Sequence, residues 1–190
     1  MTGKKNTRRS KNCIKKVFFG ILLIFFTINM SDAQFLEWAQ DFTGDDFQWS
    51  TGIVADGSGN IYVVGNFNSS SLDFNEDGTP DVTNSNPGTS DIFVAKFGIN
   101  GSFGGAIRIG GPDNDSAAGI TLDNSFRPIV FGYFFSAGMD FDGIAGDEIG
   151  GSGNGDGFIG YLDSDLGFVA GRAFGSSVGG RTEVKDVKVD

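Results

Sequence analysis

The sequence predicts an all-β protein built from repeated antiparallel units of four strands. A five-residue block that begins at Gly52 returns 67 positions later at Gly119, so the chain contains an internal duplication. Short runs rich in β-branched and aromatic residues, such as 60–67, are bounded by turn residues. After Gln34 no stretch keeps apolar residues at helical spacing over three turns. The function is therefore to be sought in the repeat rather than in one unique site.

The duplication continues over most of the chain. A loop that is two residues shorter in the second copy changes the spacing to 65 beyond it. A third copy opens at Phe168, and the sequence ends inside a strand of that copy, as expected for a fragment of a longer protein. The predicted divisions are a leader (1–33), repeat 1 (34–102), repeat 2 (103–167) and a truncated repeat 3 (168–190).

Each repeat has the strand content of a propeller blade. Four antiparallel strands that return every 65 to 67 residues are typical of β-propellers, although such blades usually take about 40 to 50 residues. Parallel β-helices have shorter repeats, and immunoglobulin-like sandwiches need about 100 residues. We therefore expect antiparallel four-stranded blades of an incomplete β-propeller, about two blades and the start of a third. The strands of the first copy are expected near 36–42, 51–56, 61–67 and 91–97.

The first 33 residues have the composition of a secretory signal peptide. Seven basic residues lie ahead of an apolar run at 17–28, and Ser31 and Ala33 supply small residues around a cleavage site. An uncleaved anchor is the alternative, but about 12 apolar residues fall short of the roughly 20 that a spanning helix needs. We expect cleavage after Ala33, no transmembrane span in the mature chain, and a secreted or cell-surface location.

Loss of the leader restricts the chemistry of the mature chain. Cys13, the only cysteine, is removed, so disulfides do not stabilise the exported form. Seven of 14 basic and one of 24 acidic residues are removed too, leaving 7 and 23 and a formal net charge of −16. This charge disfavours nucleic acid as a partner. The absence of histidine excludes the Ser-His-Asp triad and almost all zinc sites.

One acidic loop of repeat 1 has the spacing of a calcium site. Oxygen-bearing side chains stand at relative positions 1, 3, 5 and 9, with Gly78 at position 6, as in much of an EF-hand loop. Asn84 replaces the glutamate at position 12 and no flanking helices are expected, so a solvated acidic turn is the alternative. Calcium is the one cofactor predicted, and its expected ligands are Asp73, Asn75, Asp77, Asp81 and the Thr79 carbonyl.

Paired carboxylates offer an alternative, enzymatic function. Glycosidases need little more than two such groups. Two of the three available pairs fall at equivalent places in repeats 1 and 2, which favours a repeated turn over a unique acid and base. We therefore predict no catalytic residue and no enzyme activity. The pairs are Asp45 with Asp46, Asp113 with Asp115, and Asp163 with Asp165.

Three runs of repeat 1 resemble the bacterial seven-bladed β-propeller repeat known as SBBP. They are Gly-Ile-Val-Ala-Asp-x-x-Gly-Asn-Ile-Tyr-Val-Val-Gly from Gly52, Leu-Asp-Phe-Asn from Leu72, and Ser-Asp-Ile-Phe-Val-Ala-Lys-Phe from Ser90. Repeat 2 is looser, with Ser-Phe-Arg-Pro from Ser125 at the Gly-Asn turn. The resemblance implies exported, often cell-surface proteins that are frequently large, without agreed catalytic residues.

The expected function is a non-enzymatic scaffold, structural or interacting, within a larger surface or secreted protein. Its expected partner is a protein or glycan at the cell surface. Two alternatives remain at this point. One is a propeller-based, carbohydrate-active enzyme that uses carboxylates, and the other is a calcium-stabilised adhesion module.

Overall fold

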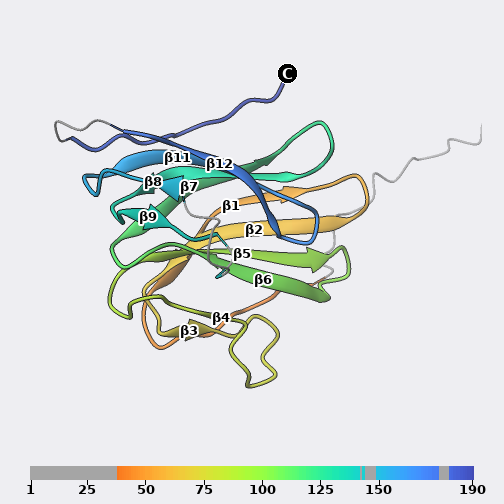
Figure 1. Cartoon of the computed structure of the whole chain (residues 1–190). Coiled ribbons are helices and arrows are strands. Elements are labelled where there is room, and N and C mark those ends of the chain that lie inside the picture. Colours follow the sequence, from red (N-terminus) through yellow and green to blue (C-terminus); the bar gives the residue numbers. More distant parts are fainter. Residues whose placement is uncertain (1–37, 142, 144–148, 176–179) are drawn as a thin grey trace, which may run out of the picture. The chain divides into compact units, whose positions relative to one another are not determined.

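The computed structural model describes residues 38–141, 143, 149–175 and 180–190 (Figure 1). The predicted leader, Cys13 and the cleavage site after Ala33 lie outside these residues. Within the described ranges the chain forms strands, turns and extended segments, and no helix. The all-β prediction is therefore confirmed.

Eight of the strands form two four-stranded antiparallel sheets. The first sheet, in spatial order, consists of β1 (Gln48–Ala55), β2 (Asn60–Phe67), β5 (Asp91–Gly98) and β6 (Phe103–Ile109). The second repeats this order with β7 (Asp115–Leu122), β8 (Pro128–Phe134), β11 (Asp156–Leu162) and β12 (Phe168–Phe174). Short pairs join β3 (Ser71–Leu72) to β4 (Val82–Thr83) and β9 (Gly138–Met139) to β10 (Ile149–Gly150). These open four-stranded sheets confirm the predicted fold class of incomplete propeller blades.

The sheets are out of phase with the sequence repeats. β6 begins repeat 2 in the sequence but pairs with β5 of repeat 1, and β12 of repeat 3 pairs with β11 of repeat 2. The prediction of a strand near 36–42 is wrong for residues 38–42, the part that the structure describes, because these residues are not in a strand. They are the counterpart of β6, whose partner precedes it in the chain.

The core lies on both faces of the first sheet. Between the two sheets, Tyr62 and Val64 pack in one cluster with Val130 and Phe158 of the second sheet. Asn66, fully buried, links the sheets by accepting a hydrogen bond from the Ala117 amide at 2.7 Å. On the opposite face, a second cluster is covered by the partly buried Trp38 and Phe42; its buried members are Phe67, Leu72, Phe74, Val82, Phe93, Ala95 and Phe97.

The turn between the first two strands of each sheet uses the same aspartate. Asp56 accepts hydrogen bonds from the amides of Ser58 and Asn60, both at 2.8 Å. Its counterpart in repeat 2, Asp123, accepts them from Ser125 and Arg127 in the same way. The turn needs one residue of positive φ, which glycine adopts without strain. Repeat 1 places Gly59 there, with a φ of 88°, whereas repeat 2 places Phe126, with a φ of 61°.

Phe126→Gly is expected to stabilise the fold by about 0.5 kcal/mol. A side chain in this region costs roughly 1–2 kcal/mol, part of which the greater freedom of an unfolded glycine offsets. Phe126 is 54% exposed, so little packing is lost. Urea unfolding measures the change. Leu166, at a φ of 71° but buried in the core, is the matched control. Leu166→Gly should destabilise by about 2–5 kcal/mol, and a destabilised Phe126→Gly would contradict the strain argument.

Candidate functional site

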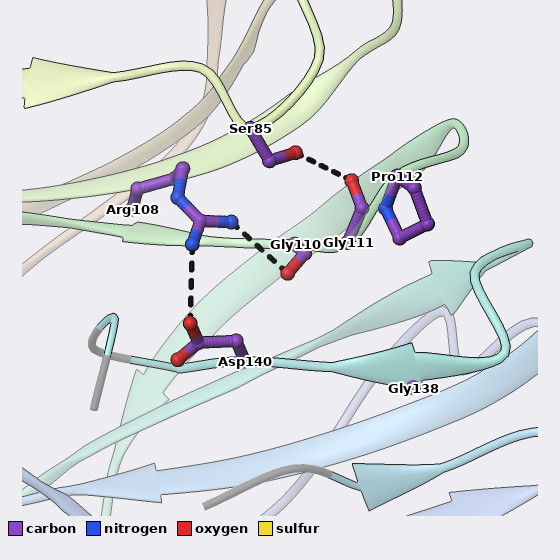
Figure 2. A pocket seen from close by; sticks show the side chains of 7 residues that line it. All are labelled: Ser85, Arg108, Gly110, Gly111, Pro112, Gly138 and Asp140. Carbon is purple, nitrogen blue, oxygen red and sulfur yellow. Dashed lines mark hydrogen bonds and ion pairs between the residues drawn. The ribbon is translucent and has the colours of Figure 1, made fainter. Parts of the chain in front are cut away.

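Equivalent pockets lie at the same place in both repeats. The pocket of repeat 1 has a volume of about 300 Å³, and that of repeat 2 about 320 Å³. Five lining positions of the second are counterparts, 67 residues on, of positions that line the first. The first is lined by Thr43, Gly44, Asp45, Ser70, Ser71 and Asp73; the second by Gly110, Gly111, Pro112, Gly138, Asp140, Ser85 and Arg108 (Figure 2).

The shared wall of these pockets is a glycine packed against a buried serine. A Cβ on Gly44 would lie 2.3 Å from Ser69 Oγ, and one on Gly111 would lie 2.6 Å from Ser136 Oγ, so neither position admits a side chain. Each serine hydroxyl also accepts a 3.0 Å hydrogen bond from the amide of an aspartate, Asp46 in repeat 1 and its counterpart in repeat 2. The repeat itself therefore builds this part of the pocket.

One polar partner of the serine differs between the repeats. In repeat 1, Ser69 Oγ donates to Gln48 Oε1 at 3.0 Å. In repeat 2, Ser136 Oγ donates to the carboxylate of Asp115, also at 3.0 Å. Asp115 is fully buried and accepts a further hydrogen bond from the Gly111 amide at 2.6 Å. A neutral amide has thus been replaced by an ionisable group at the same place.

Two buried carboxylates meet beside the second pocket. Asp91, at the start of β5, is fully buried and accepts hydrogen bonds from the Ser85 amide and hydroxyl at 2.8 and 3.1 Å. A Cβ on Gly110 would lie 2.6 Å from Asp91 Oδ1 and 3.2 Å from Asp115 Oδ2, so the carboxylates flank this glycine. Burial raises the pKa of Asp91. It raises the pKa of Asp115 to about 6, and the negative charge of Asp91 contributes.

Arg108 supplies the positive charge of this cluster. Figure 2 shows its guanidinium between the Gly110 carbonyl, at 3.0 Å, and Asp140 Oδ2, at 3.2 Å. It also lies 3.6 Å from Asp91 Oδ2. Since Arg108 belongs to β6 of the first sheet and Asp140 directly follows β9, the ion pair joins the first sheet to the segment after β9. Its counterpart in repeat 1 is Asp41, so the cation is a departure from the repeat.

Four of the six carboxylates in the three sequence pairs accept hydrogen bonds from backbone amides nearby. Asp45 accepts from the Ser70 amide and hydroxyl at 2.7 and 2.6 Å, which lowers the pKa of its carboxyl. Asp46 accepts from the next amide in the chain at 2.8 Å. Asp163 accepts from the Asp165 amide at 2.8 Å in the turn before β12. Asp113 lies exposed, two residues before the buried Asp115.

The predicted calcium loop also folds on its own side chains. Asp73 Oδ2 accepts from the Gly78 amide at 2.8 Å, and Asp81 Oδ2 from the Phe74 amide at 2.7 Å. Asn75 and Asp77 accept from the amides of Asp77 and Thr79 at 3.0 and 2.8 Å. In the described part of the chain, no three Asp, Glu, His or Cys side chains are grouped to hold a metal ion. Calcium binding therefore stays a prediction.

The sequence patterns did not predict the cluster of Arg108, Asp91 and Asp140. A usable signal exists, because Arg108 and Asp115 both replace a residue of different charge in repeat 1. These two residues meet because the two sheets pack against each other. The spacing of the repeats does not predict that packing.

No protein-family model and no curated protein sequence matches the chain. The resemblance to SBBP repeats thus rests on the three sequence runs alone. Nowhere in the described ranges does the structure contain a helix with the length and apolar character needed to cross a bilayer.

Proposed function

We propose that this chain is a non-enzymatic, exported β-propeller segment that serves as a structural or interaction scaffold within a larger surface or secreted protein. One observation carries the proposal: the pocket recurs in both repeats, built by the same glycine and serine contacts. A wall that recurs with the repeat belongs to the architecture, whereas a catalytic site is expected to be unique to one place.

The residues that depart from the repeat support the same conclusion. Arg108 is engaged by the carboxylates of Asp91 and Asp140 and by the Gly110 carbonyl. A guanidinium held by these three groups is suited to joining two sheets. The apolar leader and the acidic mature chain fit an exported protein whose partner is a protein or a neutral glycan.

Export and catalysis are tested together on the chain produced with its own leader. We expect a mature form that begins at Gln34, identified by N-terminal sequencing of the exported protein. We also expect no release of reducing ends from a panel of neutral and acidic polysaccharides. Turnover that is lost in Asp113→Asn but kept in Asp163→Asn would overturn the scaffold proposal in favour of a carbohydrate-active enzyme.

A calcium-stabilised module is the second candidate, and one atom favours it. Asp73 Oδ1 is buried without a hydrogen-bond partner, at the start of the acidic loop. A buried carboxylate oxygen of this kind costs free energy unless something satisfies it, and Ca²⁺ prefers such ligands. Asp73, Asn75, Asp77, Asp81 and the Thr79 carbonyl remain the proposed ligands.

Calcium at 100 times its Kd should raise the melting temperature of residues 34–190 by about 5–10 °C. Binding to the folded state alone gives roughly 2.7 kcal/mol at this concentration, and each kcal/mol shifts a domain of this size by about 2–4 °C. Thermal melts with calcium and with EDTA measure the shift. Asp77→Asn should remove it and Asp186→Asn, outside the loop, should keep it. Equal melting temperatures with calcium and EDTA would end this candidate.

A further inference from the structure

The equivalent pockets of the two repeats differ in charge. The pocket of repeat 2 is lined by one carboxylate, Asp140, and by the guanidinium of Arg108. The pocket of repeat 1 is lined by two carboxylates, Asp45 and Asp73, and none of its described lining residues is basic. Hydrogen bonds from Ser70 lower the pKa of Asp45, so this carboxyl is charged at neutral pH. The first pocket therefore has a negative charge that its own lining does not compensate.

The aspartate common to both pockets holds the loop that follows it in the same way. Asp140 Oδ1 accepts from the Gly143 amide at 2.7 Å, and Asp73 Oδ2 accepts from the Gly78 amide at 2.8 Å. The other oxygen of Asp140 lies 3.2 Å from the Arg108 guanidinium. The other oxygen of Asp73 is buried without a hydrogen-bond partner. The oxygen left unsatisfied in repeat 1 thus corresponds to the one that holds a guanidinium in repeat 2.

A backbone carbonyl provides the second acceptor in each pocket. In repeat 2, Gly110 forms an antiparallel bridge with Asp140, and the Gly110 carbonyl accepts from Arg108 at 3.0 Å. In repeat 1, Thr43 forms the corresponding antiparallel bridge with Asp73. The Thr43 carbonyl is therefore placed as the Gly110 carbonyl is, and repeat 1 keeps both acceptors of a guanidinium.

The donor is missing from repeat 1 because the sequence differs at one position. Asp41 is the counterpart of Arg108. The Asp41 side chain is exposed, and its carboxylate accepts from the Phe42 amide at 3.0 Å. A carboxylate offers no donor to the two acceptors, and it adds negative charge two residues before Thr43. The pocket of repeat 1 therefore keeps the acceptors of repeat 2 without their cation.

A guanidinium suits these acceptors better than other cations do. Its donors lie in a fixed planar fork that matches two neighbouring oxygens, whereas an ammonium is a compact and strongly hydrated point charge. The second repeat shows the fit directly, in a pocket of about 320 Å³ against about 300 Å³ in repeat 1 (Figure 2). Calcium bound in the acidic loop would use the same Asp73 oxygen, so the two ligands should compete.

We propose that the pocket of repeat 1 binds an arginine side chain of a partner protein. The guanidinium donates to Asp73 Oδ1 and to the Thr43 carbonyl, in the place that Arg108 takes in repeat 2. The Asp45 carboxylate adds negative charge to the pocket wall. The proposal rests on the scaffold function and gives the chemistry of its partner, a protein with an exposed arginine. The net negative charge of the chain favours the approach of such a partner.

Binding of N-acetyl-arginine amide to the exported protein tests the proposal. This blocked amino acid presents the side chain as a residue within a protein does. Isothermal titration calorimetry in the presence of EDTA should give a Kd of about 1 mM, as expected of so small a ligand. The neutral citrulline analogue should bind about tenfold more weakly, because it cannot form charge-assisted hydrogen bonds. The lysine analogue should also bind more weakly, since it lacks the planar fork.

Three variants locate the binding in this pocket. Asp73→Asn removes the charged acceptor and should weaken binding about tenfold. Glu76→Gln removes a negative charge from the same loop and should leave binding unchanged, because Glu76 is exposed and does not line the pocket. Asp41→Arg supplies the cation from the chain itself, as Arg108 does in repeat 2. It should abolish binding of the probe and raise the melting temperature.

Four results would overturn the proposal. Two are equal affinities for the arginine and citrulline analogues, and unchanged affinity in Asp73→Asn. The third is an exported protein that does not bind the probe, as expected if a basic side chain of the protein itself fills the pocket. The fourth is tighter binding of free arginine than of the blocked analogue, which would make the amino acid the ligand. Each result leaves the scaffold function standing, because that function fails only if the chain is not exported or turns over a polysaccharide.

Discussion

Raising the pH from 4 to 7 is expected to destabilise the fold by about 2.5 kcal/mol through Asp115 alone. The folded pKa of Asp115 is about 6, above its unfolded value of 3.8, because the buried carboxylate is desolvated beside Asp91. The folded state therefore binds this proton more tightly than the unfolded state does. The resulting stabilisation is fully present below pH 3.8 and is lost as the pH rises through 6. Two pKa units correspond to about 3 kcal/mol.

A comparison with Asp115→Asn measures this contribution together with the coupling between Asp115 and Asp91. The carboxyls of Asp45, Asp56 and Asp123 have lowered pKa values and therefore act on stability in the opposite direction in both proteins. The difference in unfolding free energy between the variant and the wild type should rise by about 2.5 kcal/mol, in favour of the variant, between pH 4 and pH 7. Urea unfolding at several pH values measures it. The exposed Asp113→Asn gives the baseline, and a difference independent of pH would contradict the raised pKa.

The strands could be predicted from the sequence because each repeat contains the same β-rich runs. It was harder to predict which four strands form one sheet. The similarity between the copies gives their spacing in the sequence but not the point at which one structural unit ends. The local signal for the phase was present at Asn100 and Gly101, a hairpin that joins β5 to β6. Placing a repeat boundary after residue 102 divides this hairpin and leads to the misplaced strand at 36–42.

The site was less predictable for a different physical reason. The pocket walls recur, so they are visible as repeated glycine and serine positions. The ion cluster arises only where two sheets face each other, since Asp91 starts a strand of the first sheet and Asp115 starts one of the second. Their sequence separation carries no periodic signal. Departures from the repeat, such as Asp41 to Arg108 and Gln48 to Asp115, are the signals that point to this interface.

Arg108→Ala is expected to destabilise the fold by about 3–5 kcal/mol. The substitution leaves Asp91, which is fully buried, without the cation 3.6 Å away, and removing one partner of a buried ion pair costs this much. It also removes the link between the first sheet and Asp140, which follows β9. Urea unfolding at pH 7.5 gives the largest effect, since the Asp91 carboxyl is more fully deprotonated there than at lower pH. At pH 4.5 the loss should be smaller, because Asp91 has a raised pKa and gains a proton more readily.

Arg127→Ala is the matched control for the loss of an arginine. Arg127 pairs with Asp123 at 2.7 Å, but the arginine side chain is 45% exposed, and exposed pairs contribute at most about 1 kcal/mol. Adding Asp91→Asn to Arg108→Ala should recover part of the lost stability, because the uncompensated charge is then absent. If the double variant is no more stable than Arg108→Ala alone, the loss comes from the packing of the arginine side chain rather than from the buried charge.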